Sequence, residues 1–168
     1  MATAALPRTT PGAFHSKLST NVESFSDSAP FTLTHLVSDP ASKTCAVIDP
    51  VLDFDPKSGR TSTDGADKVI ARIRERGLTL SWVLETHVHA DHLSGAQHIT
   101  AALGGRIGIG ANVTDVQKTF IDIYNLTDVA PDGSAFDHLF EDGETIEIGA
   151  LKGHVMFTPG HTPACITY

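Results

Sequence analysis

The sequence predicts an α/β domain in which helices and strands form layers around a mixed sheet. Apolar segments early in the chain alternate between strand-like runs and runs with helical spacing, whereas late segments follow one another as adjacent strand-like runs. The length of 168 residues suits one domain with one core and is too short for two. We therefore expect one domain over residues 23–168, preceded by a flexible extension over residues 1–22.

The predicted extension has an unusual composition. Residues 1–22 are rich in Ser, Thr and Ala, and they include Arg8 and Lys17 but no acidic residue. This composition is typical of organellar transit peptides, although Pro7 and Pro11 disfavour the amphipathic helix that such peptides form. A flexible tail is the prediction, and a targeting segment is the alternative.

The first elements of the domain are predicted from alternation and turn residues. Residues 31–49 indicate a β-hairpin, because FTLTHLV alternates, an Asp-Pro turn follows, and TCAVID returns as an apolar run. Residues 51–65 are rich in Asp, Pro, Ser and Gly and are expected to be a loop. A helix is expected over residues 66–76, ended by a glycine and capped by one of three residues, Ser62, Thr63 or Asp64.

The middle of the chain continues the alternation of strands and helices. Residues 78–86, LTLSWVLET, predict a buried strand that ends directly before His87. A helix is expected over residues 92–103, then a short strand RIGIG over residues 106–110, and then an amphipathic helix over residues 113–123.

The last third of the chain predicts strands. After a polar loop, residues 144–149 and 151–159 form an expected strand pair, and the sequence PGHT over residues 159–162 is the next turn. The final residues 164–168, ACITY, begin a strand that stops at the chain end, so we expect the sequence to be a fragment of a longer protein.

Composition narrows the class of partner. Lys and Arg total 12 against 20 Asp and Glu, a formal charge of −8, so nucleic acid is not expected to bind. The longest apolar runs, such as residues 78–84, are shorter than the roughly 20 residues that cross a bilayer, so no membrane partner is expected. Cys45 and Cys165 are expected to be small buried apolar groups in a reducing compartment, with a reactive role for Cys165 as the alternative.

One cluster of side chains has no explanation in core packing. The loop THVHADH follows the buried strand and contains His87, His89, Asp91 and His92. Neutral imidazole nitrogens and carboxylate oxygens are the ligands that suit zinc and iron ions. We interpret these four residues as metal ligands, and a chance group of surface histidines is the alternative.

His161 is the fifth candidate ligand. It follows an apolar strand at the turn Pro-Gly-His-Thr, where Gly160 would let the backbone bend close to an ion. No phosphate-binding loop, Gly-x-Ser-x-Gly elbow or dinucleotide-binding pattern is present, so the metal is expected to carry the chemistry. The other histidines are interpreted as surface or satisfied core residues: His15, His35, His98, His138 and His154.

The loop His-x-His-x-Asp-His and the later Thr-Pro-Gly-His-Thr together resemble the metallo-β-lactamase superfamily. Five stretches are similar to its persulfide dioxygenase and glyoxalase II-like branch, and more closely to bacterial β-lactamase hydrolase-like proteins: VIDPVLDFDPKSGRTS, ETHVHADHLSGA, GGRIGIG, FDHLFEDGE and FTPGHTPACITY. The resemblance covers about residues 21–168. It implies an αββα sandwich, of which this chain would hold only the N-terminal portion, with metal at the loop ends of the sheets.

The resemblance also implies a ligand set. In two-zinc members, His87, His89 and His161 match the ligands of one ion, and Asp91 and His92 match ligands of the other. In persulfide dioxygenases a single Fe(II) is held by residues that match His87 and His161 and by an aspartate from a later segment. This sequence departs from the family there, because the chain ends before the Gly-Asp turn that supplies that aspartate.

The resemblance implies a mononuclear iron dioxygenase that oxidises glutathione persulfide to sulfite in sulfide detoxification, with Asp91 and His92 as catalytic residues. Its alternatives are a zinc-dependent hydrolase of glutathione thioesters and an inactive metal-binding fragment. A β-lactamase is the least expected activity, because no secretory signal precedes the domain. The expected partner is a small thiol such as glutathione persulfide. The expected location is the cytoplasm, with the mitochondrion as the alternative, and the chain can be a monomer or a homo-oligomer.

Overall fold

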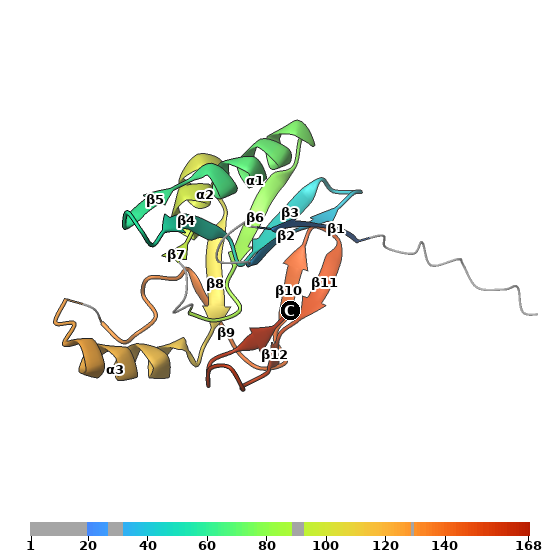
Figure 1. Ribbon diagram of the computed structural model, residues 1–168. Helices are drawn as coiled ribbons and strands as arrows, with labels where there is room; N and C mark the ends of the chain where they lie inside the picture. The colour runs from blue at the N-terminus through green and yellow to red at the C-terminus, as the bar shows by residue number, and fades with distance from the viewer. Residues whose placement is uncertain (1–19, 27–31, 89–92, 129) are drawn as a thin grey trace, which may run out of the picture.

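The molecule is built on a mixed sheet of six strands (Figure 1). The computed structural model describes residues 20–26, 32–88, 93–128 and 130–168. The first three strands of the sheet are antiparallel, and the last three continue parallel to the third. The strands are, in sheet order, β1 (Asn21–Ser26), β2 (Leu33–Asp39), β3 (Thr44–Ile48), β6 (Thr79–Leu84), β8 (Arg106–Gly110) and β9 (His138–Phe140). This order confirms the predicted mixed sheet.

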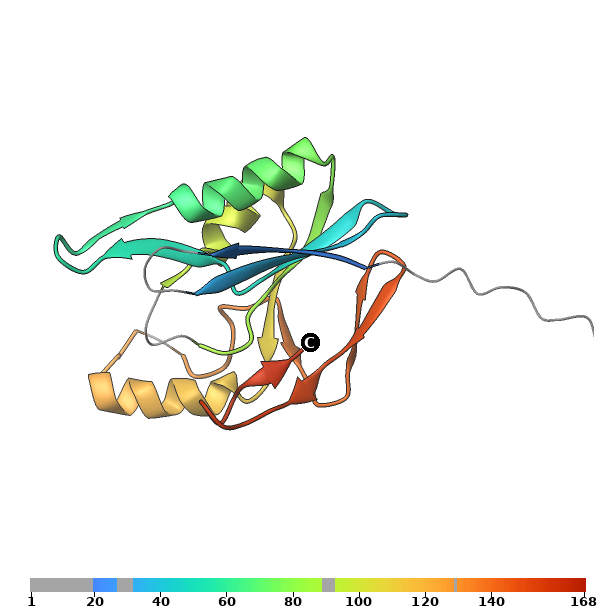
Figure 2. The ribbon, with the colours of Figure 1, turned by 45° about the vertical axis from the view of Figure 1, so that its right-hand side comes forward.

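Helices α1 (Asp64–Glu75) and α2 (Ala96–Leu103) cover one face of this sheet, as both ribbon views show (Figures 1 and 2). A third helix, α3 (Val113–Tyr124), follows β8. Helix α1 begins after Thr63, one of the three predicted capping residues, although the hydroxyl of Thr63 donates to the Asp67 carboxylate and not to the backbone. No helix in the described ranges is long and apolar enough to cross a membrane.

The opposite face of the sheet is covered by two strand pairs, which lie below it in Figure 2. The first pair joins β10 (Thr145–Ile148) to β11 (Leu151–His154), and the second joins β12 (Met156–Phe157) to β13 (Ile166–Thr167). The resulting order of layers is helix, sheet and strand pairs. This order fits the N-terminal portion of an αββα sandwich.

Strands β3 and β6 pack on both sides of the sheet because their side chains alternate. Cys45 and Val47 of β3 pack against the helices, whereas Ala46 packs against the strand pairs. On β6, Val83 faces the helices and Trp82 faces the strand pairs. The domain therefore has two hydrophobic cores that share the same two strands.

Three parts of the chain differ from the sequence-based expectation. The predicted loop 51–65 contains a hairpin of β4 (Val51–Asp55) and β5 (Arg60–Ser62), closed by Asp55, which accepts hydrogen bonds from the Lys57 amide and the Ser58 hydroxyl. The expected helix 92–103 begins only at Ala96, because β7 (Leu93–Ser94) precedes it and pairs with β4. Strand β9 lies in a segment that the sequence predicts to be a polar loop.

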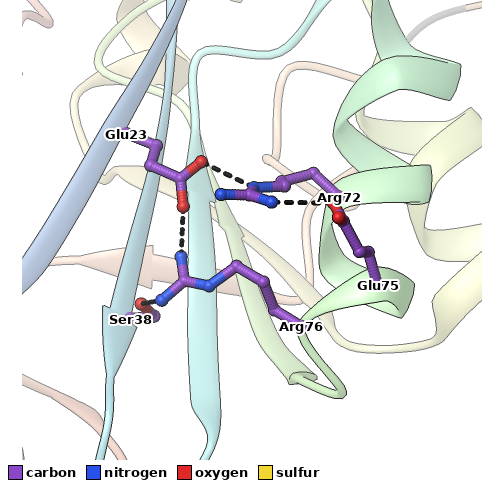
Figure 3. A network of polar contacts seen from close by, with 5 residues as sticks. All are labelled: Glu23, Ser38, Arg72, Glu75 and Arg76. Carbon is purple, nitrogen blue, oxygen red and sulfur yellow. Dashed lines mark hydrogen bonds and ion pairs between the residues drawn. The ribbon is translucent and has the colours of Figure 1, made fainter.

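Strand β1 is attached to helix α1 by a network of charged side chains (Figure 3). The Glu23 carboxylate accepts hydrogen bonds from Arg72, at 2.8 Å, and from Arg76. Arg76 also donates to the Ser38 hydroxyl on β2, at 3.1 Å. The hydrogen bond from Arg72 holds the pKa of Glu23 below its ordinary value. Residues 21 and 22, which we assigned to the extension, are thus part of a strand, and residues 1–19 lie outside the described residues.

A buried carboxylate connects the two sides of the domain near the β2–β3 turn. Asp39 accepts hydrogen bonds from the Ser42 hydroxyl at 2.6 Å, from the Ala41 amide at 3.0 Å and from the Ala150 amide at 2.9 Å. These donors lower the pKa of Asp39 from its ordinary value of 3.8 to about 2. Because Ala150 lies in the β10–β11 turn, this carboxylate fixes that strand pair to the main sheet.

Candidate metal centre

A carboxylate fixes the backbone at the start of the loop that contains the predicted ligands, directly after the central strand β6. Asp49, directly after β3, accepts hydrogen bonds from the Thr86 amide at 2.7 Å and from the Thr86 hydroxyl at 2.8 Å. The Asp49 amide in turn donates to the Leu84 carbonyl at 2.8 Å. Asp49 adopts a φ of +48°, a conformation that a non-glycine residue rarely takes. The end of β3 therefore fixes the backbone of the residue before His87.

The same hydroxyl orients the imidazole of His87. Its oxygen lies 2.9 Å from Nδ1 of His87, and its single proton is donated to Asp49. Toward His87 the oxygen must therefore accept, so Nδ1 carries the ring proton. In a neutral ring the lone pair is then on Nε2, the nitrogen that would bind a metal.

His161 reaches the same place from the β12–β13 turn. The Cys165 sulfur lies 3.2 Å from the Thr162 amide and 3.1 Å from its hydroxyl, which closes the turn around His161. Two hydrogen bonds attach the following strand to the exit of β6. The Ile166 amide donates to the Thr86 carbonyl at 3.0 Å, and the Tyr168 hydroxyl donates to the Glu85 carbonyl at 3.1 Å.

The two anchored histidines face one another. The ring centres of His87 and His161 are 5.0 Å apart, with the ring planes at 87°. Two imidazoles bound to one ion at metal–nitrogen distances of about 2.1 Å place their ring centres roughly 5 Å apart, so this pair fits a shared ion. His89, Asp91 and His92 lie outside the described residues, and their place at the site stays a prediction. Among the residues described, no group of three or more His, Cys, Asp or Glu is assembled.

A cavity of about 320 Å³ opens beside His87. It lies between the ends of β6 and β8, the start of α2 and the segment before β9. Its walls are mostly apolar, and they include five hydrophobic side chains: Val88, Leu93, Ile107, Ile109 and Phe136. The cavity offers an environment of low polarity next to the candidate ligand.

The sequence-based reasoning missed a buried acid at this cavity. Glu85 is 3% exposed and accepts a hydrogen bond from the hydroxyl of Ser94, across the loop. Burial, together with the negative charges of Asp49 and Glu85, raises the pKa of Tyr168 above its ordinary value. An acidic residue at the end of a buried strand was the available signal, because such a side chain needs a partner when it is buried.

The remaining histidines were predicted to have no part in the site. His35, His98 and His138 contact Ser24, Asp67 and Glu144 respectively, at 2.9, 2.8 and 2.6 Å, which confirms them as satisfied polar residues. His154 is exposed, and His15 lies outside the described residues.

Both cysteines are free thiols. Cys45 is buried as expected, and burial raises its pKa to about 12. The expectation was wrong for Cys165, which is only half-buried because its sulfur contacts the polar groups of Thr162 in the turn.

Comparisons with known proteins agree with this arrangement. The family model described as "Metallo-beta-lactamase superfamily" matches residues 31–168. A beta-lactamase hydrolase-like protein from Xylella fastidiosa is 48% identical over 147 residues, covering 88% of this chain and 34% of that protein. Glyoxylase B2 from Dictyostelium discoideum is 47% identical over 149 residues, covering 88% of this chain and 51% of that protein.

More distant matches extend the comparison to persulfide dioxygenases. The human mitochondrial persulfide dioxygenase ETHE1 is 28% identical over 137 residues, which covers 82% of this chain and 42% of that protein. The crystal structure of ETHE1 from Myxococcus xanthus superposes with a TM-score of 0.64 at 25% identity, covering 87% of this chain and 52% of that chain. This chain thus spans about a third to a half of the length of its curated relatives.

The family assignment rests on agreement between sequence, fold and site. The family model covers most of the chain. The chain also superposes on the crystal structure of a metallo-beta-lactamase from Staphylococcus aureus, with a TM-score of 0.63 at 22% identity. His87 and His161, which come from two separate parts of the chain, lie with their rings close to one another. The chain therefore belongs to the metallo-β-lactamase superfamily.

Proposed function

We propose that this protein is a metal-dependent persulfide dioxygenase that oxidises glutathione persulfide to sulfite. The observation that carries the proposal is the pair of facing imidazoles of His87 and His161 beside an apolar cavity. Overall, each glutathione persulfide would consume one O2 and one water, and glutathione, sulfite and two protons would be released. The relatives named persulfide dioxygenase support this choice of substrate.

In this proposal a single Fe(II) is held by His87, His161 and a carboxylate. When bound, Fe(II) supplies open coordination positions for O2 and for the substrate sulfur. Asp91 and His92 are the proposed catalytic residues, and with His89 they would orient the ligands and the substrate by hydrogen bonds. The apolar walls of the cavity would exclude water from the reacting sulfur.

The residues described around the site have defined tasks. Asp49 and Thr86 hold the ring of His87 in the tautomer that presents Nε2. Ile166 and Tyr168 hold the hairpin that carries His161 against the exit of β6. The ring of His87 and the hairpin that carries His161 are thus positioned before an ion binds, which lowers the cost of assembling the site.

Hydrolysis of a glutathione thioester is the second candidate. It is favoured by the 47% identity to Glyoxylase B2, which exceeds the 28% identity to the human persulfide dioxygenase. In this case His87, His89 and His161 would hold one Zn(II), and Asp91 and His92 would hold a second. Zinc lowers the pKa of bound water to about 7, so the metal would supply a hydroxide at neutral pH.

Elemental analysis of the purified and dialysed protein separates these candidates. About one iron per chain, with O2 consumption on addition of glutathione persulfide, is the expected result. Two zinc ions per chain, with hydrolysis of S-lactoylglutathione and no O2 consumption, would replace the dioxygenase by the hydrolase. Retention of neither metal would contradict both enzymes and favour an inactive metal-binding fragment.

Three histidine variants sharpen this test. His87→Ala should remove the bound metal and the activity in either enzyme, because His87 belongs to both ligand sets. His154→Ala is the matched control, since this histidine is exposed and lies on β11. His89→Ala should reduce metal content far more in the zinc hydrolase than in the iron dioxygenase. Equal metal loss in the His87 and His89 variants would count against a mononuclear iron site.

A further inference from the structure

A second cavity, of about 280 Å³, is separate from the candidate metal centre. It shares no lining residue with the cavity beside His87. Its lining includes Trp82 and Phe140, which belong to the core between the main sheet and the strand pairs. The cavity beside His87 instead reaches Ile107, which belongs to the core under the helices. The two cavities therefore lie on different faces of the main sheet.

The floor of the second cavity consists of buried aromatic rings. Trp82 and Phe140 are 6% and 1% exposed, and their ring centres lie 5.4 Å apart. The two rings meet over Gly108 of β8, where an added Cβ atom would be 2.5 Å from the Phe140 ring and 3.3 Å from the Trp82 ring. Because Gly108 has no side chain, the indole of Trp82 can extend from β6 across β8 toward β9.

Arg106 gives one end of this cavity a positive charge. Its guanidinium carbon lies 3.9 Å from the centre of the Trp82 ring. Stacking on an aromatic ring occupies the face of a guanidinium group and leaves the N–H groups at its edge accessible. Within the four described ranges, the Trp82 ring is the only partner of this guanidinium. Its N–H groups are therefore available to a planar carboxylate, which guanidinium groups bind with two parallel hydrogen bonds.

Glu144 gives the other end of the cavity a negative charge. One oxygen of its carboxylate lies 2.6 Å from Nε2 of His138, and the other accepts a hydrogen bond from the Glu141 amide at 2.9 Å. The ring centre of His138 lies 6.0 Å from that of Trp82, so these contacts fix the carboxylate beside the aromatic floor. Each carboxylate oxygen has two lone pairs, so Glu144 can accept a further hydrogen bond from a ligand.

We propose that this cavity binds a small zwitterion of the α-amino acid class, with its carboxylate on Arg106 and its ammonium group on Glu144. A purely anionic ligand would meet Glu144 and also Glu147, which lines the cavity 3.7 Å from Lys152. A purely cationic ligand would meet Arg106. The volume lies just below the range of about 300–1,000 Å³ that is typical of drug-sized ligands, so it suits a molecule as small as an amino acid. The proposed site goes beyond the proposed function and needs no metal.

The test uses the Trp82 side chain as its reporter. Trp82 is the only tryptophan of the chain, so the NMR signal of its indole N–H reports on this cavity alone. The probes are L-alanine, propionate and ethylamine, because propionate lacks the ammonium group of alanine and ethylamine lacks its carboxylate. L-Alanine should shift the signal saturably. Propionate and ethylamine should each bind at least about 10-fold more weakly, since each has lost a hydrogen-bonded charged group.

Variants of the complete chain assign the two ends of the ligand. Arg106→Gln should weaken the binding of both L-alanine and propionate, by about 10- to 100-fold for L-alanine. Arg106→Lys keeps the charge without the planar group and should have an intermediate affinity. Glu144→Gln should weaken L-alanine and should not weaken propionate. Arg60→Gln is the matched control, because Arg60 is an exposed arginine on β5, and it should change neither affinity.

Three results would overturn the proposal. If L-alanine causes no saturable shift, Arg106 only shields the Trp82 ring from water. Equal affinities for L-alanine and propionate would exclude the contact between the ammonium group and Glu144, and with it the zwitterion. Unchanged binding of L-alanine to Arg106→Gln would place the ligand elsewhere on the protein. Because none of these measurements involves a metal, the failure of the proposed function would leave the test of this site unaffected.

Discussion

The contact between Thr86 and Asp49 can be tested by the substitution Thr86→Val. Valine keeps the β-branched shape of threonine, so the packing at the end of β6 changes little. It removes the hydroxyl that donates to the Asp49 carboxylate at 2.8 Å and that contacts Nδ1 of His87 at 2.9 Å. The Thr86 amide, 2.7 Å from the same carboxylate, is retained.

The size of the effect follows from the type of bond that is lost. A hydrogen bond to a charged group contributes about 1.5–3 kcal/mol to the free energy of unfolding. For a chain of this size, a change of 1 kcal/mol shifts the midpoint of thermal unfolding, Tm, by about 2–4 °C. Thr86→Val is therefore expected to lower Tm by roughly 3–12 °C.

Thr79→Val provides the matched control, because Thr79 is exposed at the other end of the same strand. Substitutions at such positions usually change the free energy of unfolding by no more than about 0.5 kcal/mol. Both variants are compared with wild type by calorimetry, and by urea unfolding to check that the slope with denaturant stays constant. If Thr86→Val and Thr79→Val have the same Tm, the hydrogen bond from the Thr86 hydroxyl to Asp49 does not stabilise the fold as described.

Three further predictions concern other contacts. The pKa of Asp39 is about 2 in the folded protein against an ordinary value of 3.8, so its carboxylate stabilises the fold above pH 4 and this contribution is lost as the pH falls toward 2. In the wild type, the urea midpoint of unfolding should fall as the pH falls from 4 toward 2, and Asp39→Asn should make this fall smaller. An equal fall in both proteins would exclude this role of Asp39. Gly95→Ala should destabilise the protein by about 1–3 kcal/mol, because the new Cβ atom would meet the Val51 carbonyl, and a wild-type Tm would show that the two strands separate easily. Cys165→Ser should keep the contacts with Thr162 that close the turn, whereas Cys165→Ala should lose them and weaken Co(II) binding. Equal Co(II) affinities in the two variants would show that the sulfur does not shape the site.

Parts of the fold with strong periodicity could be predicted from the sequence. The β2–β3 hairpin, helix α1 and strand β6 begin and end within a few residues of their expected bounds, because each buries a regularly spaced apolar face. Strands β4 and β7 could not be predicted in the same way. Residues 51 and 52 of β4 pair with β7 about 40 positions later in the chain, and that pairing depends on the assembled sheet.

Candidate ligands could be proposed from the sequence, whereas the contacts around them could not. His87 and His161 are candidates because each follows an apolar strand at a turn, and their ring centres lie 5.0 Å apart in the structure. Their proximity depends on hydrogen bonds from Ile166 and Tyr168 to the residues directly after β6. No local sequence pattern predicts these hydrogen bonds. The partner of Glu85 was hidden for the same reason, since a serine nine residues away gives no signal of its own.

The sharing of β3 and β6 between the two cores has a consequence for how the molecule opens. Loss of either core would leave one side of the same two strands exposed, so the helical layer and the strand pairs should unfold together in a single cooperative transition. Amides of β3 and β6 should then be the slowest to exchange in the whole protein. His87 lies three residues after the end of β6, so its backbone stays attached to this most persistent element until the entire domain unfolds.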